Sequence, residues 1–130
     1  MRLRRSQGFT LIELMVVVAI IGILSAVGVV SYTGYKSSAE KKQAEITLNL
    51  INLAQQEYKS NNGEYCISTC SNNAGIIQNL FDGVDDLSAQ TFNYSNNSNN
   101  TLTMMAVKKS NSACTITITQ TNKNPIRRGC

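Results

Sequence analysis

The sequence contains no histidine and no tryptophan among its 130 residues. Histidine is the side chain most often used for proton transfer near neutral pH and for binding catalytic zinc. Without it, only carboxylates and lysines remain as acid or base, and the neighbouring pair Asp85 and Asp86 does not by itself make a mechanism. We therefore expect that the chain is not an enzyme and that it holds no metal and no cofactor.

Beyond its first eight residues, the sequence also lacks an excess of positive charge. The formal charge is +4, but Arg2, Arg4 and Arg5 all precede a long apolar run. Without the first eight residues, nine basic side chains face eight acidic ones. Net charge therefore indicates little about partners, because the basic character belongs mostly to the N-terminal segment.

The apolar run covers residues 9–30 and contains one charge, Glu13. As a helix these 22 residues extend ~33 Å, and the hydrocarbon layer of a bilayer is ~30 Å thick. Arginines precede the run and the next basic residue is Lys36. The positive-inside rule then predicts a cytoplasmic N-terminus and an exported remainder.

The change from polar to apolar falls at Gly8-Phe9, before the apolar run. An ordinary secretory signal is cut after its apolar core, whereas a cut here would retain the helix. Such a cut would also free an α-amino group on Phe9, one helical turn from Glu13. We expect this amine to neutralise Glu13 of the same chain or of a neighbour, because a carboxylate in a membrane helix is costly. The alternative is an interfacial charge that reaches the lipid headgroups.

The residues Gly8-Phe9-Thr10-Leu11-Ile12-Glu13, followed by an apolar helix, resemble the processing site of type IV prepilins and of the related pseudopilins of type II secretion. The resemblance covers about the first forty residues. It implies that a prepilin peptidase cleaves after Gly8 and N-methylates Phe9, and that Glu13 guides docking into a filament. It also implies three parts: a leader over 1–8, a transmembrane and filament-core helix over 9–30, and an exported head over 31–130.

One departure from the family concerns the position of Val30, where many of these pilins carry a proline that helps to bend or melt the helix. Gly22 and Gly28 remain as weak points, each costing ~1 kcal/mol of helix stability relative to alanine. Local melting between them in a filament is one interpretation. The other is that both glycines let neighbouring helices approach closely.

The fold class expected from the whole chain is α+β, a pilin fold with a long N-terminal helix packed on a small antiparallel sheet. The helix is predicted over residues 9–60, with a stop at Asn61-Asn62-Gly63. After Ser31 its apolar residues recur at steps of three and four, which predicts an amphipathic helix that continues out of the membrane. These residues are Ala39, Ile46, Leu50, Leu53, Ala54 and Tyr58.

Strands are predicted over 91–94, 101–108 and 114–120, with polar hairpin loops at 95–100 and 109–112. The alternation of Ile116 and Ile118 with threonines predicts a sheet with one buried face. Residues 64–88 are expected to connect helix and sheet, with a short helix or a lid at 76–81, and residues 121–130 show no regular period. Asp82, Asp85 and Asp86 have the oxygen ligands of a calcium site, but we favour turn residues around Gly83.

Four cysteines, Cys66, Cys70, Cys114 and Cys130, follow the apolar run. An exported domain meets an oxidising compartment, so we expect two disulfides. Three pairings are possible and the sequence does not choose among them, although pairing of sequence neighbours is the simplest. A zinc site of four thiolates is the rival, and the cysteine spacings fit it poorly.

The favoured function is a structural subunit, a major or minor pilin, that polymerises with itself and other pilins for adhesion, twitching motility or DNA uptake. Its expected partners are the prepilin peptidase, the inner-membrane assembly machinery, and DNA or host and abiotic surfaces. One alternative is a DNA-binding minor pilin that uses a basic patch, and the rival for the patch is solvated loop charge. The patch would contain Lys108, Lys109, Lys123, Arg127 and Arg128. The other alternative is a pseudopilin of a type II secretion system.

Overall fold

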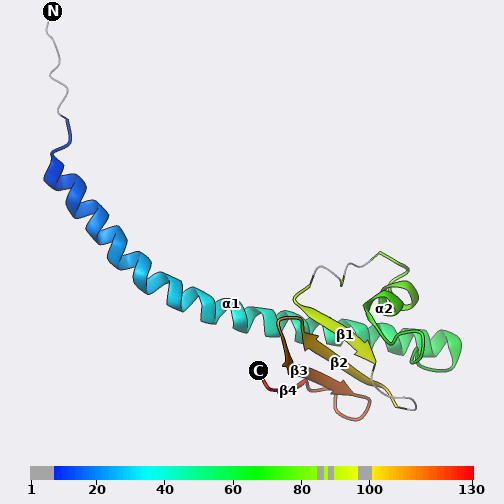
Figure 1. The fold of residues 1–130 in the computed structure, drawn as a ribbon. Helices are drawn as coiled ribbons and strands as arrows, with labels where there is room; N and C mark the ends of the chain where they lie inside the picture. The colour runs from blue at the N-terminus through cyan, green and yellow to red at the C-terminus, as the bar shows by residue number, and fades with distance from the viewer. Residues whose placement is uncertain (1–7, 85–86, 88–89, 97–100) are drawn as a thin grey trace, which may run out of the picture. The chain divides into compact units, whose positions relative to one another are not determined.

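The computed structural model describes residues 8–84, 87, 90–96 and 101–130. Two helices precede four strands, and the chain divides into two compact units, up to Ser38 and from Ala39 onward. The elements are α1 (Leu11–Asn62), α2 (Asn73–Leu80), β1 (Phe92–Asn96), β2 (Thr103–Lys108), β3 (Asn111–Thr119) and β4 (Ile126–Arg128). Figure 1 shows the sheet of the second unit against the C-terminal half of α1, which confirms the predicted α+β fold.

Helix α1 ends where the sequence predicted. The helix closes at Asn62, and Gly63 has a φ of +83°, a left-handed conformation that glycine adopts without steric cost. Its backbone N–H donates to the carbonyl of Lys59 at 2.8 Å and so satisfies one of the last carbonyls of the helix.

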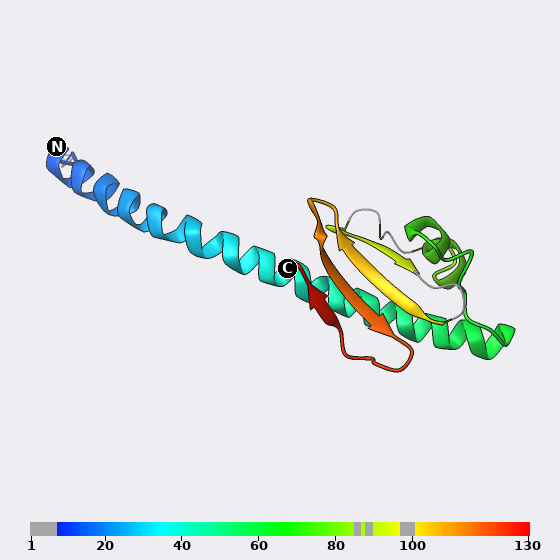
Figure 2. The same ribbon diagram turned by 60° about the horizontal axis from the view of Figure 1, so that its bottom comes forward.

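The sheet is antiparallel, with the strand order β1-β2-β3-β4 (Figure 2). Along β3 the side chains of Cys114, Ile116 and Ile118 are buried, while the threonines between them are partly exposed. The predicted sheet with one buried face is therefore confirmed. Its core also contains Phe92 and Tyr94 from β1, both 1% exposed.

Most apolar residues of the amphipathic pattern are not the residues that α1 buries. Ile46, Leu50 and Leu53 are 54%, 50% and 62% exposed, and Ala39 is exposed as well. Ala54 and Tyr58 are half-buried. The side chains that α1 buries are Ala44, Thr47, Leu48, Ile51, Asn52 and Gln55.

Hydrogen bonds explain why polar side chains of α1 are buried. Gln55 accepts from the backbone N–H of Cys66 at 2.9 Å and donates to the carbonyl of the same residue at 2.7 Å. The Thr47 hydroxyl lies 3.1 Å from the amide oxygen of Gln90, which also accepts from the Tyr94 hydroxyl at 2.7 Å. These partners fix the rotation of the helix against the sheet, because turning it would leave buried polar groups unpaired.

Strand β4 was not predicted. Residues 126–128 lie in a tail that shows no period, yet they pair with β3, with Thr115 opposite Arg128 and Thr117 opposite Ile126. Three residues are too few for alternation to be recognised. Likewise β1 continues through Ser95 and Asn96, which we assigned to a loop.

The connection between helix and sheet contains the short helix that we considered for this region. Asn72 caps α2 by accepting from the backbone N–H of Gly75 at 2.8 Å, and Ile76 is buried. After α2 the chain turns through Asp82 and Gly83, with φ of +50° and +77°. Asp85 and Asp86, considered above as calcium ligands, lie outside the residues that the structure describes.

Candidate functional site

The start of α1 carries the residues that we singled out for processing and docking. Gly8 and Phe9 precede the helix, and the Phe9 side chain is 90% exposed. The backbone N–H of Thr10 donates to Oε2 of Glu13 at 2.8 Å, and the Thr10 hydroxyl donates to the same oxygen at 2.7 Å. The N–H of Glu13 faces the Thr10 hydroxyl oxygen at 3.4 Å.

Thr10 and Glu13 together form a capping box, in which each residue satisfies a backbone N–H of the first turn. The carboxylate is thereby held at the N-terminus of the helix. We did not predict this role for Thr10, although the Thr-x-x-Glu spacing is a readable signal for it.

The segment that follows is apolar on every side. From Leu11 to Val30 its large hydrophobic side chains are between 48% and 77% exposed, and the most apolar window of α1 has no buried residue. The segment is long and apolar enough to cross a membrane. The Ser25 hydroxyl donates to the carbonyl of Ile21 at 2.7 Å, so its polar group is satisfied within the helix.

The helix is continuous through Gly22 and Gly28, and nothing lies within 4 Å of where either Cβ would be. In the single chain neither glycine makes a close contact. Melting between the glycines, and close approach of another helix at them, both stay predictions for the assembled state.

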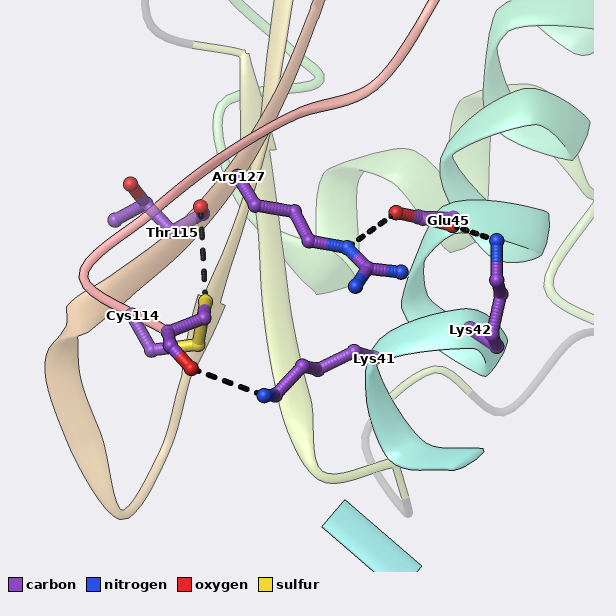
Figure 3. Close-up of polar contacts among 7 residues, drawn as sticks. Lys41, Lys42, Glu45, Cys114, Thr115 and Arg127 are labelled. Carbon is purple, nitrogen blue, oxygen red and sulfur yellow. Dashed lines mark hydrogen bonds and ion pairs between the residues drawn. A yellow bond between two sulfur atoms is a disulfide. The ribbon is translucent and has the colours of Figure 1, made fainter. Parts of the chain in front are cut away.

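The four cysteines form two disulfides between sequence neighbours. Cys66 joins Cys70 with a Cα–Cα distance of 5.6 Å, and Cys114 joins Cys130 with 4.4 Å. The first contains Cys66, whose backbone is hydrogen-bonded by Gln55, and the second fastens the chain that follows β4 to β3 (Figure 3). Both bonds therefore anchor segments that have little regular structure of their own.

The basic side chains of the head are partly used within the chain. Arg127 Nε lies 2.6 Å from Glu45 Oε1, and Lys42 Nζ lies 3.0 Å from Oε2 of the same carboxylate (Figure 3). The hydrogen bond from Arg127 lowers the pKa of Glu45 most, and the hydrogen bond from Lys42 also lowers it. Lys108 pairs with Glu40 at 3.0 Å, and Lys41 donates to the carbonyl of Cys130 at 2.9 Å.

Two of the five residues of the predicted basic patch, Lys108 and Arg127, thus face carboxylates of α1. Arg128 follows on β4, and Lys123 lies in the connection between β3 and β4, where it is exposed. Lys109 follows the end of β2. The structure does not gather all five side chains into one surface free of acidic partners.

Among the described residues, shallow clefts of about 310 and 330 Å³ open on the head. The first is polar and lies at the end of α1, and the second lies between α1 and β1. The first is lined by Ala54, Glu57, Tyr58, Asn61, Asn62, Asn79, Leu80 and Asp82. Within the described ranges, no group of three or more Cys, Asp or Glu side chains is placed to hold a metal ion.

Comparison with known proteins shows which proteins the N-terminal segment is similar to. Residues 3–29 match the family described as the prokaryotic N-terminal methylation motif. The chain is 39% identical over 61 residues to the type IV major pilin protein PilA of Myxococcus xanthus, which covers 47% of this chain and 28% of that protein. It is 44% identical over 59 residues to the fimbrial protein of Neisseria meningitidis serogroup B, which covers 45% of this chain and 35% of that protein.

A second group of relatives belongs to type II secretion. The type II secretion system core protein G of Aeromonas hydrophila is 38% identical over 65 residues, half of this chain and 46% of that protein. The matched stretch thus spans less than half the length of each of these relatives, and no solved structure matches the chain. The N-terminal segment thus contains the prokaryotic N-terminal methylation motif, and the first half of the chain is similar to type IV pilins and to core protein G of type II secretion systems.

Proposed function

We propose that this chain is a structural subunit, a major or minor pilin, of a type IV pilus that polymerises through its apolar N-terminal helix into an extracellular filament. The observation that carries the proposal is the helix itself. Residues 11–30, all but the last of which lie within the match to the methylation motif, expose large aliphatic side chains all round. A helix that is apolar all round is normally buried, and lipid followed by a filament core would bury this one.

Processing would prepare the helix to leave lipid and enter a filament core. A prepilin peptidase removes residues 1–8 and N-methylates Phe9. The capping box uses only Oε2 of Glu13, so the other carboxylate oxygen is available to the new amine of Phe9 in the same chain or a neighbour. Pairing would cancel a charge that is costly in an apolar core, and it would set the register between subunits.

The precursor would be a single-pass inner-membrane protein with its N-terminus in the cytoplasm. The head from residue 31 onward would lie outside, where its two disulfides suit an oxidising compartment. Other pilins and the membrane-bound assembly machinery would be its partners. Adhesion, twitching motility or DNA uptake would depend on the exposed head, through contact with DNA or with host or abiotic surfaces.

Two alternatives rest on particular observations. The core protein G relatives support a pseudopilin of a type II secretion system, which would share the processing but remain in the envelope. A DNA-binding minor pilin would use the basic patch, from which Lys108 and Arg127 would first have to leave their carboxylates. Its DNA binding would weaken steeply as the salt concentration rises.

The proposal is tested by separating sheared surface filaments from membranes in cells that express the parent chain, Glu13→Ala or Glu64→Ala. Glu64 is an exposed carboxylate of the head and serves as the matched control. We expect the parent and Glu64→Ala in the filament fraction, and Glu13→Ala processed but confined to the membrane. A processed parent chain that never leaves the membrane favours the pseudopilin alternative.

A further inference from the structure

Two tyrosines follow the apolar segment on one face of α1. Tyr32 and Tyr35, here called the tyrosine belt, are 67% and 75% exposed, and Lys36 beside them is exposed as well. Steps of three and four residues from Tyr32 place all three side chains on one face of the helix. Neither hydroxyl of the belt has a hydrogen-bond partner among the residues that the structure describes, whereas the hydroxyl of Tyr94 in the head donates to Gln90.

The chemistry of tyrosine suits the boundary between hydrocarbon and water. Its ring is apolar, and its hydroxyl can bond to water and to lipid headgroups, so tyrosine is enriched at both faces of membranes. Toward the N-terminus, residues 14–30 include no charged residue. Toward the C-terminus, Lys36 is followed by four further charged residues up to Glu45. The belt therefore lies where an apolar environment has to give way to water.

The distance from the belt to Glu13 matches the thickness of a membrane. Helix α1 is continuous between them. From Glu13 to Tyr32 it rises ~28 Å, or ~27 Å across the membrane at the usual tilt, and the hydrocarbon layer is ~30 Å thick. A carboxylate and an aromatic pair thus mark the two ends of one apolar span. With both ends at the boundaries, the bilayer midplane falls near Ile23, whereas the middle of the apolar run 9–30 lies near Ile20.

We propose that Tyr32 and Tyr35 anchor the precursor in the lipid headgroups on the side of the membrane away from the cytoplasm, and so fix the depth of α1. This inference rests on the membrane-spanning precursor of the proposed function and not on filament assembly. At this depth Glu13 lies among the headgroups of the cytoplasmic face, where water solvates its carboxylate. The charge is then tolerated in the membrane and becomes costly only when the helix leaves lipid for an apolar core.

The absence of tryptophan from the chain allows the depth to be measured with single tryptophans. The full-length precursor carrying Ile20→Trp or Ile23→Trp is reconstituted in phosphatidylcholine vesicles, whose acyl chains hold bromine either near the headgroup or near the chain end. Bromine quenches tryptophan fluorescence on contact, so the ratio of deep to shallow quenching reports depth. We expect Ile23→Trp to be the deeper of the two by ~4 Å, since three residues of helix separate the positions. A third variant, Tyr35→Trp, should be quenched mainly by the shallow bromine.

The belt itself is tested in the background of Glu13→Leu, because Glu13 also marks a boundary. With both tyrosines present, Ile23→Trp should remain the deepest position. Tyr32→Gln together with Tyr35→Gln should then move the midplane toward Ile20, a shift of ~4 Å. Glutamine keeps a good helix former at both positions and removes the aromatic rings.

The matched control introduces two glutamines just beyond the belt, as Ser37→Gln with Ser38→Gln, and should leave the depth unchanged. A depth that stays the same when the tyrosines are lost would overturn the inference, as would Ile20→Trp being deepest while they are present. In either case deep quenching would still uphold the membrane-spanning helix. If the deep bromine reached neither Ile20→Trp nor Ile23→Trp, the proposed membrane-spanning precursor would fail together with the inference.

Discussion

The buried amide of Gln55 offers the sharpest test of how the head is held together. Its side chain is 1% exposed and makes two short hydrogen bonds to the Cys66 backbone, at 2.9 Å to the N–H and 2.7 Å to the carbonyl. Gln55→Leu keeps the volume and removes both bonds. The unpaired N–H costs about 1–3 kcal/mol, and the carbonyl, which keeps only a contact of 3.5 Å with Asn96 Nδ2, costs about 1–2 kcal/mol more, so the loss should be about 2–5 kcal/mol.

For a head of this size, a loss of that magnitude lowers the melting temperature by at least about 10 °C. The assay is thermal unfolding of the full chain in detergent micelles, followed by the near-ultraviolet circular dichroism of tyrosine. Tyr94 is buried in the core and reports on the head. The control is Gln56→Leu at the exposed neighbouring position, where the change should stay within about 0.5 kcal/mol. Equal melting of the two variants would refute the role assigned to Gln55.

Three further predictions concern the same domain. Leu48→Ala, at a fully buried position, should cost about 2–5 kcal/mol of unfolding free energy. Leu50→Ala should change the unfolding free energy of the isolated subunit by less than about 0.5 kcal/mol, and urea titration distinguishes the two variants. Replacing Cys114 and Cys130 together by serine should cost about 3 kcal/mol by the same titration, because the disulfide closes a loop of 16 residues. The pKa of Glu45 is lowered by Arg127, so its contribution to stability is present above the ordinary pKa of 4.5 and lost as the pH falls through the lower, folded value. Glu45→Gln should therefore be less stable than the parent at pH 7 and should lose less stability on acidification. Parallel curves of unfolding free energy for parent and variant between pH 7 and 3 would contradict this.

The sequence was sufficient for the parts of the fold that local pattern specifies. Residues 9–30 predict a helix by composition, and Gly63 predicts its end because it can take a positive φ. The isoleucines of β3 predict a one-sided sheet through alternation. Each of these signals depends on neighbours in the chain.

The sequence was insufficient where contacts between residues far apart in the chain determine the structure. The face of α1 that packs on the sheet is chosen by Gln55 with Cys66 and Thr47 with Gln90, and the second pair is 43 positions apart. Because the helix has apolar residues on both sides, periodicity does not tell which side packs on the sheet.

The same reason explains why β4 and part of the candidate site were not predicted from the sequence. The pairing of Arg127 with Glu45 joins residues 82 positions apart, so two members of the predicted basic patch are placed by tertiary contacts. By contrast, the segment from Gly8 to Glu13 is contiguous, and it lies within the residues that match the methylation motif. Only the capping function of Thr10 was missed there.

The central claim is that this chain is processed and then built into a filament. The most direct measurement is the intact mass and N-terminal residue of the chain in sheared surface filaments, with and without reduction. The account predicts a chain that begins at N-methylated Phe9 and is lighter than its reduced form by the four hydrogens of two disulfides. A chain that retains Met1 and is found only in the membrane would contradict it.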